Sequence, residues 1–83
     1  MKTVKKLRKK IDSIDGKIVK LLDKRVLTAA EIVKIKCADG SPVYDLNRET
    51  EILSHVGSKT DNLKAEDVQF IYKVILDIIR KYL

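Results

Sequence analysis

The chain of 83 residues is poor in the residues that interrupt helices or build disulfide and metal sites: it has one proline, three glycines, one cysteine and no tryptophan. Because Cys37 is alone, we expect no intrachain disulfide, no cysteine-rich metal site and no redox pair, as is usual in the cytosol. No run of 18 apolar residues is present, so we expect no membrane span. The basic N-terminus lacks the apolar stretch of a signal peptide. These absences predict a cytoplasmic protein.

The common catalytic motifs are also missing. The sequence has no Cys-His or Ser-His pairing with supporting spacing, no His-Glu-x-x-His motif and no glycine-rich phosphate loop. We therefore expect no metal and no cofactor. An enzyme with this sequence must work with cations and carboxylates alone.

The composition, with 45 % hydrophobic and 36 % charged residues and a net charge of +6, is typical of a soluble helical protein. Residues 1–83 are expected to form one domain, which buries only about 60 % of its unfolded surface and gains from dimerisation. Much of the positive charge crowds the N-terminus, at Lys2, Lys5, Lys6, Arg8, Lys9 and Lys10. Such a block is usually a solvated face. Nucleic-acid binding generally adds aromatic residues, a zinc site or a helix-turn-helix, and none is evident.

The most informative stretch runs from Val4 to about Cys37, where apolar residues recur at intervals of three and four and predict one helix. Some 33 residues in a helix span about 50 Å. A compact domain of this size has a radius of gyration of only about 12 Å. The helix must therefore extend beyond its own domain, and we expect it to pack along a second copy of the chain.

A heptad seam that starts at Val4 carries apolar residues at Leu7, Ile11, Ile14, Ile18 and Leu21, and its next position is Arg25. A buried arginine needs an anionic partner. Lys36 follows 11 residues later on the same face, about 16 Å along the axis. Two interpretations remain open: Arg25 and Lys36 grip a small anion together, or Arg25 pairs with a carboxylate such as Asp15 of a partner helix.

The rest of the chain predicts two further helices. Ala38–Tyr44 contains Asp-Gly-Ser-Pro, in which Gly40 suits positive φ after a helix. Asp45 is a suitable N-cap for a short helix over about Leu46–Val56. A polar loop over residues 57–62 precedes a third helix.

The third helix is expected to begin near Asn62 or Leu63 and to run to the end of the sequence, with Phe70 in the core. The predicted fold class is all-α, with one long, one short and one medium helix in an intertwined homodimer.

Six charged residues, in order, resemble the all-helical class of chorismate mutases, a type also found fused to prephenate dehydratase or dehydrogenase. They are separated by 17, 11, 9, 3 and 1 positions and are Arg8, Arg25, Lys36, Asp45, Arg48 and Glu49. The resemblance implies a homodimer that converts chorismate to prephenate by a concerted [3,3] rearrangement in phenylalanine and tyrosine biosynthesis. That reaction needs no nucleophile, which agrees with the missing motifs.

The resemblance also implies roles for these residues. Arg8 and Arg25 would bind the two substrate carboxylates, and Lys36 would donate to the breaking ether oxygen. Glu49, with the Asp45 region, would take the ring hydroxyl, and Arg48 would shape the same corner. Arg8 and Arg25 lie about 25 Å apart on one helix, so Arg8 must come from the partner chain if both bind one substrate.

One departure from the family pattern concerns the last helix. Family members usually offer a polar residue to a substrate carboxylate there and, one turn later, a glutamine or glutamate to the ether oxygen. Here these positions are Ile79 and Leu83. A slow mutase, a donor recruited from elsewhere, a piece of a longer protein and a relative that binds without much turnover all fit this departure.

Two other functions are compatible with the sequence. An isochorismate-pyruvate lyase on the same scaffold would share the cationic site, and its products, pyruvate and salicylate, would distinguish it. A non-catalytic basic helical dimer would bind an anionic partner. Its function would survive Arg25→Ala and Lys36→Ala, and its binding would weaken steeply with salt.

Overall fold

The structure is a computed structural model that describes residues 3–83. Three helices follow one another along the chain: α1 (Val4–Asp39), α2 (Leu46–Gly57) and α3 (Ala65–Arg80). Residues 3–83 contain no strand, so the prediction of an all-α fold with a long, a short and a medium helix is confirmed. Lys2 of the predicted basic block lies outside the described residues.

Side-chain and backbone caps fix both ends of α1. The Thr3 hydroxyl accepts a hydrogen bond from the Lys6 amide at 3.2 Å. At the other end Gly40 has a φ of 74°, as predicted. The amide of Gly40 donates to the Cys37 carbonyl and that of Ser41 to the Lys36 carbonyl, the pattern of a Schellman motif. α1 therefore ends about one helical turn beyond Lys36, where the chain changes direction.

The cap of α2 follows the prediction. The Asp45 carboxylate accepts from the Arg48 amide at 3.2 Å, so α2 begins at Leu46.

The start of α3 at Ala65 is later than predicted. The Thr60 hydroxyl accepts from the Leu63 amide at 3.0 Å and donates to the Leu63 carbonyl at 3.2 Å. These bonds close a turn that delays the helix, and Lys64 is still extended. The predicted start near Asn62 or Leu63 was wrong because the threonine competes for the backbone groups of that segment.

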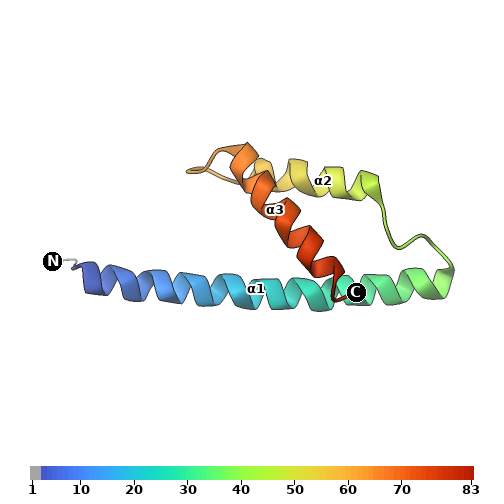
Figure 1. The fold of residues 1–83 in the computed structure, drawn as a ribbon, viewed down its shortest axis with the longest axis horizontal. Coiled ribbons are helices and arrows are strands. Elements are labelled where there is room, and N and C mark those ends of the chain that lie inside the picture. Colours follow the sequence, from blue (N-terminus) through green and yellow to red (C-terminus); the bar gives the residue numbers. More distant parts are fainter. Residues whose placement is uncertain (1–2) are drawn as a thin grey trace.

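α2 and α3 pack against each other, and the C-terminal end of α3 reaches the middle of α1 (Figure 1). The Gln69 side chain of α3 links this helix to α2, since its Nε2 donates to the Leu53 carbonyl at 3.1 Å. Leu76 and Ile79 of α3 are the buried residues of the described chain. Phe70 is 70 % exposed, so its predicted place in the core is wrong for the single chain, because it lies on the side of α3 that faces solvent.

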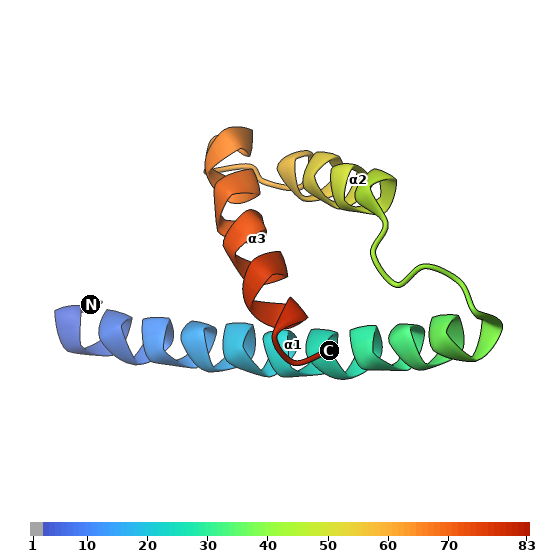
Figure 2. The same cartoon turned by 45° about the vertical axis from the view of Figure 1, so that its right-hand side comes forward.

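α1 is largely uncovered by its own chain. The molecule measures 58 × 24 × 16 Å and has a radius of gyration of 16.3 Å, because the N-terminal part of α1 extends past the other two helices (Figures 1 and 2). α1 contributes no buried residue. The predicted seam is between 42 % and 65 % exposed at Val4, Leu7, Ile11, Ile14, Ile18 and Leu21. Within residues 3–83, no helix has both the length and the apolar character needed to cross a membrane.

Two glycines, one within α1 and one at its C-cap, give opposite expectations for stability. Gly40→Ala forces a side chain into the left-handed region and should lower the free energy of unfolding by about 1–2 kcal/mol. Gly16→Ala adds a methyl group in mid-helix with nothing within 4 Å, and should raise it by about 0.5–1 kcal/mol. Urea unfolding at one fixed protein concentration measures both. If both variants changed the free energy of unfolding equally, that result would contradict the left-handed C-cap at Gly40.

Candidate active site

A cavity of about 580 Å³ lies between the three helices. The C-terminal half of α1, residues 43–45, the first turns of α2 and the last turns of α3 line it. Its size falls in the range of small-molecule sites. Its charged lining residues are Arg25, Lys36, Asp45, Arg48, Glu49 and Arg80.

α1 supplies Arg25 and Lys36, both partly buried. The ion pairs formed among residues 3–83 are Arg48–Glu51, Glu49–Arg80 and Asp77–Arg80. Neither Arg25 nor Lys36 is paired with a carboxylate of this part of the chain. Both cations are therefore available to an anion in the cavity or to a partner chain.

The start of α2 supplies the next two residues. One carboxylate oxygen of Asp45, Oδ1, accepts the hydrogen bond of the helix cap described above. The Arg48 guanidinium lies 3.3 Å from Glu51, but both side chains are about two-thirds exposed. An exposed pair of this kind contributes at most about 1 kcal/mol. Arg48 is thus only loosely restrained at the cavity rim.

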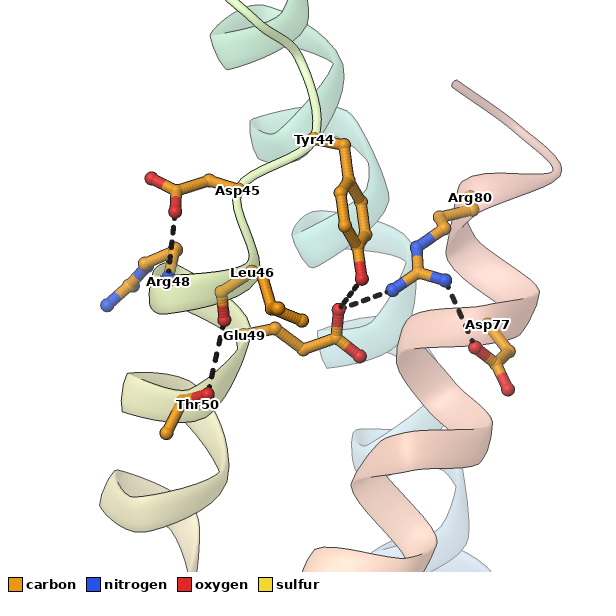
Figure 3. A network of polar contacts seen from close by, with 8 residues as sticks. All are labelled: Tyr44, Asp45, Leu46, Arg48, Glu49, Thr50, Asp77 and Arg80. Carbon is orange, nitrogen blue, oxygen red and sulfur yellow. Dashed lines mark hydrogen bonds and ion pairs between the residues drawn. The ribbon is translucent and has the colours of Figure 1, made fainter.

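Glu49 is the centre of a network that joins α2 to α3 (Figure 3). Its Oε2 accepts from the Tyr44 hydroxyl at 3.0 Å and from Nη2 of Arg80 at 2.6 Å. Nη1 of Arg80 lies 3.3 Å from Asp77, and its Cζ lies 4.8 Å from the centre of the Tyr44 ring. Among residues 3–83, no hydrogen bond reaches Oε1 of Glu49. That oxygen is available to a ligand.

The structure brings five of the six predicted charged residues to one cavity and leaves the sixth outside it. Arg8 does not line the cavity and lies about 25 Å from Arg25 along α1. Ile79 and Leu83 do line it, the first buried and the second 45 % exposed. Residues 3–83 contain no group of three or more histidine, cysteine or acidic side chains placed to hold a metal ion.

Sequence reasoning missed Tyr44 and Arg80 as residues of this cavity. The signal for Arg80 was available in the sequence, because the lining residues at the C-terminal end follow the i, i+3, i+4, i+7 spacing of one helix face: Leu76, Ile79, Arg80 and, just beyond α3, Leu83. Tyr44 gave no such signal, because it lies in an irregular segment.

The network makes a prediction about pH. The hydrogen bond to Glu49 is the largest cause that raises the pKa of Tyr44 above its ordinary value of 10.0; desolvation and the charge of Glu49 add to it, while Arg80 opposes it. Protonated Tyr44 therefore stabilises the fold below the ordinary pKa, and this contribution disappears as the pH rises through the raised value. Glu49→Gln should lower the pKa of Tyr44. A titration of tyrosinate absorbance measures this, with Tyr44→Phe identifying the transition. An unchanged transition in Glu49→Gln would contradict the hydrogen bond.

Comparison with known proteins agrees with this geometry. Residues 7–82 match the family described as chorismate mutase type II. The chain is 30 % identical over 83 residues to the T-protein of Haemophilus influenzae, covering all of this chain but 21 % of that protein. It therefore spans about a fifth of the length of that relative.

Two solved structures resemble the whole fold. A chorismate mutase from Thermus thermophilus has a TM-score of 0.87 and 27 % identity, covering 92 % of this chain and 96 % of that one. A chorismate mutase from Helicobacter pylori in complex with prephenate has a TM-score of 0.82 and 35 % identity, covering 95 % and 87 %. The three-helix fold, the cationic cavity and the match over residues 7–82 together show that the chain belongs to the chorismate mutase type II family.

Proposed function

We propose that this chain is a chorismate mutase that converts chorismate to prephenate in a homodimer with two shared active sites. The observation that carries the proposal is the single cavity lined by Arg25, Lys36, Asp45, Arg48 and Glu49. The solved Helicobacter pylori relative, a chorismate mutase, holds prephenate. Phenylalanine and tyrosine biosynthesis is the pathway that this activity would serve.

The charge of the cavity suits a dicarboxylate. Four cationic and two anionic side chains line it, which leaves two positive charges in excess. Chorismate carries two carboxylates, which would balance the excess from this chain, and the partner's Arg8 would add one more positive charge. Arginine suits the carboxylates because its planar fork donates two parallel hydrogen bonds. We assign Arg25 to one carboxylate and Arg48 to the corner that Glu49 and Asp45 form around the ring hydroxyl.

The rearrangement needs no proton donor or nucleophile from the protein. The ether C–O bond breaks as a C–C bond forms between the side chain and the ring, and no atom enters or leaves. Catalysis then consists of holding the substrate in its compact conformer and of stabilising charge on the ether oxygen. We assign the second task to Lys36. The ring hydroxyl would donate to Oε1 of Glu49, which no hydrogen bond from residues 3–83 reaches, with Asp45 fixing the start of α2.

The homodimer follows from the uncovered seam of α1 and the position of Arg8. A monomer exposes about half or more of most seam side chains, which disfavours a stable single chain. An antiparallel partner α1 would cover the seam and bring the partner's Arg8 to the cavity that Arg25 lines. Arg25, which pairs with no carboxylate of residues 3–83, would find its anionic partner in the substrate.

Lys36→Ala tests the activity. Removing the donor to the ether oxygen should lower kcat by roughly 10²- to 10³-fold. Lys34→Ala is the matched control, because Lys34 is exposed on the same helix and does not line the cavity. Loss of chorismate absorbance gives the rate, and identification of the product gives the reaction. A folded wild type that converts no chorismate, or one that releases pyruvate, would overturn the proposal.

Mixing two inactive variants tests the shared site. In a dimer where Arg8 crosses over, an Arg8→Ala chain paired with an Arg25→Ala chain holds one intact site and one doubly altered site. Random exchange of subunits should then restore about a quarter of the wild-type activity, because half of the dimers are mixed. If Arg8 served its own chain, every site would be altered and mixing would restore nothing. Sedimentation of each variant alone checks that both assemble.

A further inference from the structure

α3 gives the cavity a wall with one polar side chain. The lining residues of α3 and of the segment that follows it are the apolar Leu76, Ile79 and Leu83 together with Arg80. Ile79 is also 6 % exposed, so it belongs to the packing between the helices and has no polar atom to offer. Any side-chain hydrogen bond from α3 to a ligand in this cavity must therefore come from Arg80.

The contacts of Arg80 leave donors unused. A guanidinium has five N–H groups. In the described chain one nitrogen, Nη2, binds Glu49 at 2.6 Å and another, Nη1, binds Asp77 at 3.3 Å. Cζ of Arg80 lies over the Tyr44 ring, 4.8 Å from its centre, so the ring adds a cation–π contact to these two bonds. Arg80 therefore has N–H groups left for a ligand while its contacts with Glu49 and Tyr44 stay in place.

The Arg80 guanidinium is restrained by its neighbours but is not fully buried. The side chain of Glu49 is 22 % exposed and that of Arg80 is 44 % exposed, so water still reaches the pair. The pair joins residues 31 positions apart and holds the end of α3 beside the start of α2. A guanidinium restrained by two neighbours loses less conformational entropy when a ligand binds than a free one does.

We propose that Arg80 binds a carboxylate of the substrate from α3 and supplies the polar contact that Ile79 and Leu83 do not. This inference rests on the proposed function, since it assigns a residue to the same site. Without Arg80 this chain's lining keeps three cations against two carboxylates, and in the proposed dimer the partner's Arg8 would be a fourth cation. Tyr44 and Glu49 act as positioning residues for the guanidinium.

Arg80→Ala tests the contact. Loss of a hydrogen bond to a charged group should raise KM for chorismate, and the Kd for the product prephenate, by roughly ten- to a hundredfold, with a smaller change in kcat. Arg80→Lys should recover part of the loss, because it keeps the charge but not the planar fork. Lys81→Ala is the control, since Lys81 is the next residue, is exposed and does not line the cavity. Circular dichroism and sedimentation check that each variant folds and assembles.

A double-variant cycle separates direct binding from an effect through Glu49. If Arg80 only positions Glu49, Arg80→Ala should change nothing further in a Glu49→Gln background. If Arg80 binds the ligand, Arg80→Ala should still weaken prephenate binding by about tenfold in the Glu49→Gln background. Conversion by the wild type with no difference between Arg80→Ala and Lys81→Ala would overturn this inference alone. A wild type that neither converts chorismate nor binds prephenate would overturn the proposed function and this inference with it.

Discussion

The continuity of α1 is the constraint on which the rest of the structure depends. Thirty-six residues form one helix, capped by Thr3 at its start and by a Schellman motif around Gly40 at its end. A rigid helix fixes the separation of every cation along it, so Arg25 and Lys36 line the same cavity while Arg8 lies outside it. Distances along α1 therefore fix part of the site, and the start of α2 and the end of α3 supply its other charged side chains.

The closure of the cavity relies on polar contacts more than on a core. Two residues of the described chain are buried, and the links between α2 and α3 include the Gln69–Leu53 hydrogen bond and the Glu49–Arg80 ion pair. A partly exposed ion pair contributes little to stability, but it restricts where a carboxylate and a guanidinium point. Such an arrangement suits a reaction that depends on orientation and electrostatics. Both residues of the ion pair that joins the helices also line the cavity.

Much of the fold could be predicted from the sequence because several local patterns indicated the same three helices. The apolar spacing of α1, positive φ at Gly40 and the cap at Asp45 each depend on a few neighbouring residues, and each prediction is confirmed. The start of α3 was missed because Thr60 closes a turn whose hydrogen bonds compete with the helix. Phe70 was misplaced because hydrophobicity alone does not say which side of a helix finds a neighbour. The site was predicted less completely, since the contact between Arg80 and Glu49 spans 31 positions and no local pattern predicts a pair at that separation.

The exposed stripe of α1 has a consequence for the life of the protein in solution. In the proposed dimer, a second chain would bury the apolar side chains of the seam that this chain leaves exposed. Assembly of the proposed dimer is then second order, and the fraction of chains that carry a complete site falls as the solution is diluted. The concentration of the protein, and not only the chemistry of its active site, would then set the average activity per chain.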